Sequence, residues 1–472
     1  METDVESTIW TLSTAFGIFM YQLSSILIVR AKSGEARSVA TSQVVNFLTG
    51  IVAWYLVGYA FTYGASKDSV LRNRFIGNYS FAMYGIRDEA YQSNNFGYAW
   101  FIQAFAYAMV CNSIVAEVLG GKVNTTVHVL STTFTVSFLF PVIAHWVWSS
   151  EGWLSALRPE AVTPLGTIGA IDFAGSGVVH VLGGAIGLAA SVFLRKMDNP
   201  KGAVEDTDAL SIATFLRIFA MYSFVTGSTI SITIGHHNAT DAVYRSLELA
   251  KALSPNPADV RVDATSAMMN VAVGRAAVCL TLALAGSGLL ALALESFLCK
   301  ELNMAHAVNA LTIGFAAISS NIVTCEPWAA ILCGIVAALV YVGGRRSLKS
   351  LKDNDVFVIH GLGGIWGLLF TGVLAKPKFI RDVIGYNFAP SRYVLGEILG
   401  ADFVGELGGV APFTRHSGIF YPSDGPNGKL LAVMILEAAI ILAWGFFLAL
   451  PFFAILKALK CLKAGKYEAG KA

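Results

Sequence analysis

The chain has 472 residues, of which 55% are hydrophobic and only 14% are charged, and its mean hydropathy is +0.62. Soluble domains carry about 25% charged residues, so this composition excludes an ordinary soluble protein and indicates a polytopic membrane protein. The formal net charge of +2 comes without a basic arm or block, so the sequence indicates no nucleic-acid partner.

Eleven apolar segments have the length of about 20 residues that a helix needs to cross a bilayer. They lie at about 8–29, 43–64, 96–120, 125–147, 171–194, 209–234, 266–297, 305–323, 327–344, 355–375 and 429–456. The acidic start lacks the basic region of a cleaved signal peptide, so we expect the first segment to be retained. The sequence predicts an all-α membrane domain over 1–456 and a short tail over 457–472.

Basic residues cluster in the short connections on one predicted side of these segments. They are Arg30, Lys32, Arg37, Lys122, Arg195, Lys196, Lys201, Arg345, Arg346, Lys349, Lys352, Lys457, Lys460, Lys463 and Lys466. Short loops rich in Lys and Arg face the cytoplasm, so we expect the N-terminus outside a plasma membrane and the C-terminus inside. The long connections, at about 65–95, 149–170, 235–265 and 376–428, then lie outside.

Three N-glycosylation sequons occur in the chain. Those at Asn78 and Asn238 lie in predicted outside loops, whereas the one at Asn124 lies in a predicted inside loop and would stay unmodified. Such triplets are frequent by chance, so they make Asn78 and Asn238 candidate sites and no more.

Nothing in the sequence has the pattern of an enzyme or of a cofactor site. The six cysteines lie mostly in or beside apolar runs without metal-ligand spacing, which favours small buried side chains over ligands or disulfides. No nucleophile stands beside a paired base. We therefore expect neither an enzyme, nor a metal, nor an organic cofactor.

Two stretches repeat one local pattern about 180 residues apart. Val178–Leu188 reads VVHVLGGAIGL and Val358–Leu368 reads VIHGLGGIWGL, and an Asp lies shortly upstream of each histidine, at Asp172 and Asp355. The predicted segments that carry the histidines are five crossings apart and run in opposite directions. This predicts a 5+5 inverted repeat, as transporters often have, over about 8–194 and 209–375, with 429–456 outside it.

Longer motifs resemble the ammonium transporter (Amt/Mep) family. They are Pro141–Trp148 (PVIAHWVW), Glu151–Leu154 (EGWL), Asp172–His180 (DFAGSGVVH), Asn309–Leu311 (NAL), Gly314–Ser319 (GFAAIS), Glu326–Ala330 (EPWAA), Asp355–Gly367 and Gly428–Leu431 (GKLL). Trp148 and the Asp-Phe-Ala-Gly signature resemble the ammonium transporters more than their Rhesus-glycoprotein relatives. The resemblance implies eleven helices per subunit, a homotrimer and a narrow pore through each subunit.

The repeated histidines are the first candidate pore residues. A single histidine inside a membrane usually bonds a neighbouring helix, but two at matching repeat positions favour a pore lining. Neutral imidazoles in contact can share a proton, one nitrogen donating and the other accepting. The resemblance implies that His180 and His360 accept a hydrogen bond from ammonia and relay a proton. Ser319 and Trp366 are further pore candidates.

The resemblance also implies that Trp148, Phe224 and Ser228 recruit the ion at the outer mouth. Aromatic faces attract ammonium by roughly 0.5–2 kcal/mol each, and a serine hydroxyl can accept its hydrogen bond. The partner aromatic of Phe224 is either Phe105 or Tyr107, because the register of this helix is ambiguous. The family's glutamate at its end aligns with Gly121, and Glu117 lies one turn earlier.

Two acidic residues have open roles. Asp172, grouped with Ala174 of the same signature, could bind ammonium, take its proton, or hold a helix end through hydrogen bonds. Asp355 is expected to cap the inner end of the tenth segment. Met221 stands where the family has Trp, and Ser319 where it often has Thr.

The sequence thus predicts an ammonium transporter with ammonium and ammonia as substrates and methylammonium as a candidate second one. Recruitment of the ion at the outer mouth, its deprotonation and passage of ammonia between the histidines would make up the route. An ammonium sensor with the same fold and a Rhesus-like gas channel are the alternatives.

Overall fold

The computed structural model describes most of the chain. The described residues are 2–33, 36–64, 73–86, 97–156, 168–194, 206–234, 264–300, 303–348, 355–380, 383, 416–421 and 428–462. Helices dominate these ranges, and the β-structure found there is one isolated bridge between Ser155 and Ala170. The fold is all-α, as predicted.

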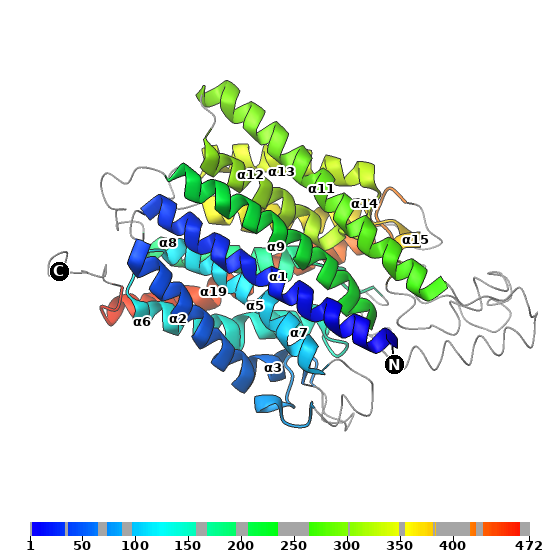
Figure 1. Cartoon of the computed structure of the whole chain (residues 1–472), viewed down its shortest axis with the longest axis horizontal. Helices are drawn as coiled ribbons and strands as arrows, with labels where there is room; N and C mark the ends of the chain where they lie inside the picture. The colour runs from blue at the N-terminus through cyan, green and yellow to red at the C-terminus, as the bar shows by residue number, and fades with distance from the viewer. Residues whose placement is uncertain are drawn as a thin grey trace, which may run out of the picture.

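Each of the eleven predicted segments is helical (Figure 1). The first half contains α1 (Glu2–Ser33), α2 with η1 and α3 (Ala36–Ala53, Trp54–Gly58, Tyr59–Tyr63), α5 (Gly97–Leu119), α6 with η4 and α7 (Thr125–Phe134, Thr135–Leu139, Phe140–Trp148), and η5 with α8 (Ser176–Val181, Leu182–Leu194). The second half contains α9 (Thr207–Ile234), α11 (Ala264–Cys299), α12 with η7 (Met304–Ile318, Ser319–Asn321), α13 (Pro327–Ser347), and η8 with α14 (Phe357–Leu362, Gly363–Leu374). The long α19 (Lys429–Ala458) follows, and η3 (Phe81–Met83) and α15 (Pro377–Ile380) are short connecting turns.

Ten helices in the described ranges are long and apolar enough to cross a membrane. The eighth predicted segment is the exception, because α12 has only 15 residues, or about 22 Å at 1.5 Å per residue. The 3₁₀ turn η7 extends it by roughly 6 Å. This segment therefore completes its path with a tight turn, which carries Ser319.

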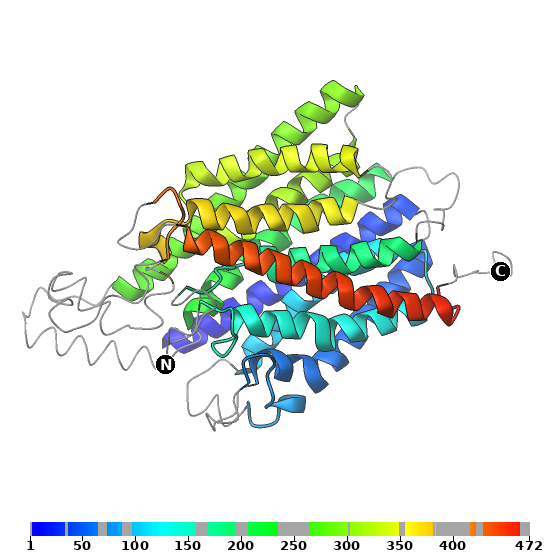
Figure 2. The ribbon, with the colours of Figure 1, turned by 180° about the vertical axis from the view of Figure 1, so that it is seen from behind.

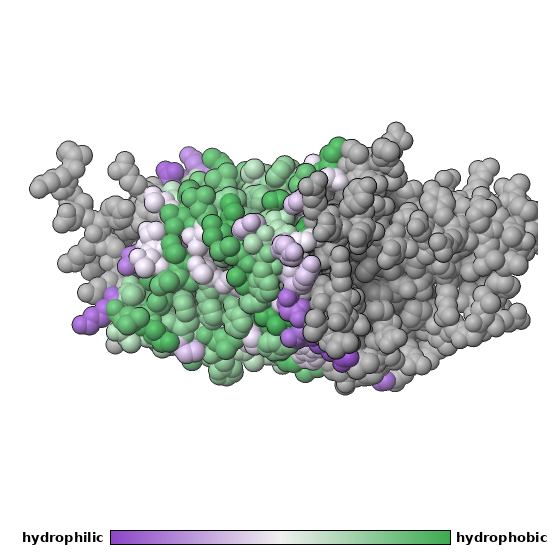
Figure 3. All heavy atoms as spheres, turned by 90° about the horizontal axis from the view of Figure 1, so that it is seen from below, coloured by the Kyte–Doolittle hydropathy of each residue, from purple (hydrophilic) through white to green (hydrophobic). Residues whose placement is uncertain are grey.

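The helices form one bundle whose long axes run broadly along a common direction (Figures 1 and 2). α1 begins at the end of the bundle opposite to the one at which α19 ends, which fits an odd number of crossings. Large apolar side chains on the outer faces remain exposed, among them Phe16, Leu48, Phe215, Leu289 and Phe447. Figure 3 shows a wide apolar region on the described surface, the kind of surface that lipid covers.

The two repeated stretches form matching helices that cross in the middle of the bundle, and each is called a broken helix here because a π-helical turn replaces its regular α-helical hydrogen bonds around the histidine. Each histidine lies in a π-helical turn, η5 or η8, that continues into an α-helix. A Cβ on Gly184 would lie 2.5 Å from the nitrogen of Gly361, and one on Gly364 would lie 3.1 Å from the nitrogen of Val181. Only glycine permits this approach, and the crossed pairing shows that the helices are antiparallel, as the predicted inverted repeat requires.

The fifth predicted segment starts later than expected. Residues 171–175 are not helical, and the helix begins at Ser176. Gly175 has φ +75°, a left-handed conformation that glycine adopts without strain. The segment before it is bonded to the turn η7 instead, since the amides of Phe173 and Ala174 donate to the carbonyls of Ser320 and Ser319. Asp172 therefore precedes the helix.

A buried ion pair joins α1, α5 and α9. The guanidinium of Arg217 donates to the carboxylate of Glu117 and to the hydroxyls of Ser24 and Ser25, 3.1 and 2.9 Å away, and covers the ring of Tyr21. Sequence reasoning assigned Glu117 no role beyond the ambiguous register of this helix. The side chain of Arg217 is 4% exposed and that of Glu117 is 10% exposed, so each charge needs the other.

Replacing Arg217 with leucine should destabilise the protein by about 3–5 kcal/mol, since Glu117 would remain buried without its partner. The double variant Arg217→Leu/Glu117→Leu should recover much of this loss. Unfolding of the purified protein in detergent measures both values. A double variant no more stable than the single one would contradict the assignment.

Candidate functional site

The two repeated histidines meet inside the crossing of the broken helices. Their Nδ1 atoms are 3.0 Å apart, the rings are within 9° of parallel, and both side chains are buried. At this distance one Nδ1 donates and the other accepts, and either tautomer pair satisfies the geometry. The Nε2 atom of His180 is buried and has no hydrogen-bond partner among the described residues.

Aromatic rings form a continuous chain from Trp148 to this pair. The ring centroids of Trp148 and Tyr107 are 5.7 Å apart, and those of Tyr107 and Phe224 are 4.6 Å apart. Phe315 follows at 5.5 Å from Phe224 and lies 4.9 Å from the ring of His180, edge to face. Sequence reasoning missed Phe315, although it lies inside the motif that ends at Ser319.

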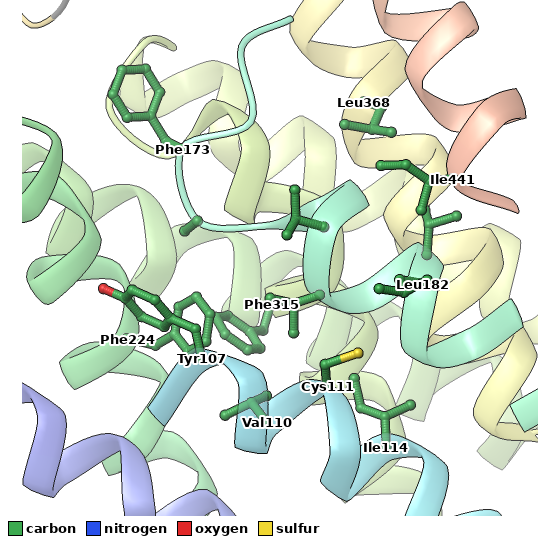
Figure 4. Packing of buried hydrophobic residues seen from close by; sticks show 14 of the residues in the cluster. Tyr107, Val110, Cys111, Ile114, Phe173, Leu182, Phe224, Phe315, Leu368 and Ile441 are labelled. Carbon is green, nitrogen blue, oxygen red and sulfur yellow. The ribbon is translucent and has the colours of Figure 1, made fainter. Parts of the chain in front are cut away.

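The structure distinguishes the two aromatic candidates on α5. Tyr107 packs on Phe224, whereas Phe105 faces the other way and contacts Phe19 and Phe47 at 5.8 and 5.7 Å. Figure 4 shows Tyr107, Phe224 and Phe315 gathered on one side of α8, the helix that begins at Leu182. Tyr107 is therefore the aromatic residue that completes the pair with Phe224.

A hydrogen-bond chain holds the hydroxyl of Tyr107. The amide nitrogen of Gln103 donates to it at 2.6 Å, and the hydroxyls of Ser228 and Tyr107 are 3.1 Å apart. Thr14 of α1 donates to the carbonyl oxygen of Gln103 at 3.2 Å. Gly227 makes room, since a Cβ there would clash with Gln103 and lie 2.8 Å from Thr14 Oγ1. Gln103, four residues before Tyr107, could have been found by the i, i+4 rule.

Asp172 lies directly beside Trp148 and the start of the broken helix. Its Oδ2 accepts the amides of Gly177 and Val178, each at 3.0 Å, and its backbone carbonyl accepts the indole N–H of Trp148 at 2.6 Å. These bonds satisfy two of the amides that every helix start leaves open. The second carboxyl oxygen, Oδ1, is buried and has no hydrogen-bond partner among the described residues.

Ser319 and Ala174 are brought together by the backbone bond between Ser319 oxygen and Ala174 nitrogen, 3.0 Å long. The hydroxyl of Ser319 donates to the carbonyl of Phe315 in its own helix. The next residue, Ser320, bonds both Ser176 and Thr371. This turn therefore fixes the start of one broken helix against the other.

Two further predicted residues contact neighbouring helices. Asp355 reaches across to neighbouring helices, with Oδ1 3.3 Å from Arg345 Nε and Oδ2 3.4 Å from Asn309 Nδ2. It therefore braces α12 and α13 and does not act as a simple helix cap. The indole of Trp366 donates to the carbonyl of Cys333 on α13 and packs near Phe370, so its described contacts lead away from the histidine pair.

Asn78 is exposed in the described segment 73–86, and Asn238 lies outside the described residues. Within the described ranges no group of three His, Cys, Asp or Glu side chains is placed to hold a metal ion. The arrangement is instead a row of aromatic rings that leads from a carboxylate to two imidazoles.

Comparison with known proteins identifies the family. The family described as Ammonium Transporter Family matches residues 8–253 and 260–470. Ammonium transporter 1 member 1 of Arabidopsis thaliana is 30% identical over 446 residues, which cover 92% of this chain and 76% of that protein. Ammonium transporter 1 member 3 of Solanum lycopersicum is 31% identical over 481 residues, which cover 99% and 90%.

Solved structures share the fold. The structure titled "Sensor Amt Protein" superimposes with a TM-score of 0.69 at 20% identity and full coverage of both chains. Mep2 of Saccharomyces cerevisiae gives a TM-score of 0.68 at 18% identity, covering 98% of this chain and 92% of that one. With the match along nearly the whole sequence, the chain belongs to the ammonium transporter family.

Proposed function

We propose that this protein carries ammonium across a membrane by separating the ion into ammonia and a proton. The observation that carries the proposal is the row of rings that runs from Trp148, beside Asp172, to the pair His180 and His360. A bare cation is strongly disfavoured in the apolar interior. Ammonia is neutral and meets no such penalty.

The ion is recruited at the end of the bundle where Trp148 lies. The faces of Trp148, Tyr107 and Phe224 attract a cation, at roughly 0.5–2 kcal/mol per contact. The Ser228 hydroxyl, near the phenol oxygen of Tyr107, is the oxygen that accepts an N–H of the ion. Sodium is attracted as well, but it loses far more hydration at such a site.

Deprotonation takes place near Asp172, and ammonia then passes Phe224 and Phe315 to the histidines. His180 Nε2, which has no hydrogen-bond partner among the described residues, accepts a hydrogen bond from it. The Nδ1 contact leaves room for one proton only, so His180 and His360 cannot both be charged. The same contact gives a path along which a proton can follow.

Ammonium-evoked current in a reconstituted bilayer tests the proposal. Ammonium and methylammonium should each evoke a current if the proton follows ammonia, and potassium should evoke none. Passage of ammonia alone would alkalinise the vesicle interior without current. Absence of both current and uptake would refute transport and leave the sensor as the surviving alternative.

Tyr107→Phe should raise the ammonium concentration for half-maximal uptake roughly 2–10-fold, the effect of one lost hydrogen bond of about 0.5–1.5 kcal/mol. The variant keeps the ring on Phe224 but removes the oxygen near Ser228. Tyr341→Phe is the matched control, because it removes a phenol bonded to the amide of Asn309 at the other end. Equal effects of both variants would argue against a role of Tyr107 in recruitment.

The orientation and the assembly are part of the same proposal. The described basic residues at the Asp355 end include Arg30, Lys122, Arg345, Arg346, Lys457 and Lys460, and they indicate that this end faces the cytoplasm. Trp148 then faces outward across the plasma membrane, and three copies assemble. Cysteine labelling of intact cells at Asn78 and native mass spectrometry test the two statements.

A further inference from the structure

Glu437 is a buried acid within the last long helix. It is the only acidic residue of α19, it is 0% exposed, and neither carboxyl oxygen has a hydrogen-bond partner among the described residues. An ionised carboxylate in such a place is very costly without a compensating charge. A side chain that only filled space here would not need to be an acid.

Glu437 faces Asp172 across a glycine. A Cβ on Gly177 would lie 2.8 Å from Glu437 Oε1 and 3.2 Å from Asp172 Oδ2. The two carboxyl groups therefore border on the same small space, which exists because residue 177 has no side chain. Asp172 is only 4% exposed, and its Oδ1 also has no partner among the described residues.

Among the described residues, the elements that pack against α19 supply no balancing positive charge. α19 packs on α8, α14 and η5, and the first two contain no titratable side chain. His180 of η5 is turned to His360.

A further histidine, His416, lies near the Trp148 end of the bundle, where its Nε2 accepts a hydrogen bond from the amide of Gly169. Burial lowers the pKa of His416 to about 4, so its ring is neutral at physiological pH. Lys429 lies two turns nearer the start of α19 than Glu437.

The broken helix separates Glu437 from the aromatic chain. Figure 4 shows Ile441, one turn after Glu437, beside Leu182 and Leu368 and away from Phe224 and Phe315. Glu437 therefore does not line the path of the rings. Its connection to that path is Asp172, whose backbone carbonyl holds the indole of Trp148.

We propose that Asp172 and Glu437 form one acidic unit that holds a single proton at rest and accepts the proton that ammonium loses. Two carboxyl groups at such close range do not both ionise in a buried site. The resting unit carries one negative charge, which attracts the cation. This inference rests on the proposed function.

A proton moves from ammonium to the acidic unit in the proposed step. An N–H bond of ammonium breaks, its electron pair stays on nitrogen, and an O–H bond forms on the ionised carboxylate. Ammonia and a neutral pair of carboxylic acids result, so no net charge is left in the interior. The unit returns to rest when one proton leaves again.

Infrared spectroscopy of the reconstituted full-length protein tests the resting proton. The wild type at neutral pH should show the carbonyl band of a buried carboxylic acid, and Glu437→Gln should lose that band. Ammonium chloride should increase the band in the wild type, and potassium chloride should not. A wild-type spectrum without the band, or a band that ammonium leaves unchanged, would overturn the proposal.

The pH profile of uptake tests the coupling of the two groups. In Glu437→Gln the midpoint should move to lower pH by about one unit or more, because Asp172 then faces no second acid. Glu437→Asp should restore part of the shift. Glu295→Gln is the control, since Glu295 is a buried acid paired with Arg345 at the other end, and it should leave the midpoint in place.

The two hypotheses fail in different ways. A wild type without ammonium uptake or current would refute the proposed function. A wild type that transports while Glu437→Gln keeps both the midpoint and the infrared band would refute only the shared proton. If Glu437→Gln does not fold, the wild-type response of the band to ammonium still decides.

Discussion

His180→Ala is expected to reduce ammonium uptake at least about 100-fold, the lower end of what a positioned proton-transferring group contributes. The change removes Nε2, the proposed acceptor for ammonia, and leaves Nδ1 of His360 without the partner 3.0 Å away. It also opens a cavity beside Phe315, which packs edge to face on the lost ring. Uptake of labelled methylammonium, in a strain without transporters of its own, measures the loss per folded protein.

His128→Ala is the matched control. His128 is also a buried histidine, but it bonds the carbonyl of Gly120 and the side chain of Asn46, away from the repeated pair. It should lower stability while leaving uptake per folded protein close to the wild type. A His180→Ala protein that transports as well as His128→Ala would rule out the pore role of the pair.

The second large effect is expected from Asp172→Asn. Asparagine keeps an oxygen that can accept the amides of Gly177 and Val178, so the helix start should survive with a loss below about 1 kcal/mol. It has no charge and cannot take a proton. Ammonium uptake should therefore fall by a factor on the order of 100 or more while the unfolding transition barely moves.

Asp172→Ala separates the two roles that the sequence left open. It removes charge and helix bonds together, so it should lose uptake and also about 0.5–2 kcal/mol of stability. If Asp172→Asn transports normally and only Asp172→Ala is impaired, Asp172 serves the helix start alone. Uptake and thermal unfolding, measured on the same preparations, decide between these outcomes.

The sequence was most informative where the chain repeats itself. Because His180 and His360 occur in matching stretches an odd number of crossings apart, their antiparallel arrangement followed from counting alone. The glycines of both stretches were visible too. Their purpose, the approach of Gly184 to Gly361 and of Gly364 to Val181, needs three-dimensional contacts that no count of residues provides.

Helix register limited the prediction of the aromatic partner of Phe224. Phe105 and Tyr107 are two residues apart, which on an α-helix is a rotation of about 200°. An error of two positions in the register of α5 therefore selects the residue that faces Phe19 instead of the one that faces Phe224. The break before Ser176 was missed for a related reason, since an apolar run does not reveal where its hydrogen bonds begin.

Glu437 was missed because α19 lies outside the repeat. Symmetry reasoning pairs residues within the two halves and says nothing about the extra helix. The sequence nevertheless contained a simple indication of Glu437, because it is the single acidic residue in the 30 mostly apolar residues of α19. An acidic residue inside a membrane is by default a candidate functional residue. The partner Asp172 could not have been named from the sequence, because it is 265 positions away.

The crossing of the broken helices limits how this protein can work. Backbones that touch through Gly184 and Gly364 cannot slide or rock apart without breaking the contacts of the whole interior. A cycle in which each half swings alternately toward either side of the bilayer, on microseconds to milliseconds, would have to break these contacts in every turn. On the proposed route, throughput depends instead on ring flips and solute diffusion, so ammonium uptake should remain fast when the subunit is held rigid by cross-links between its halves.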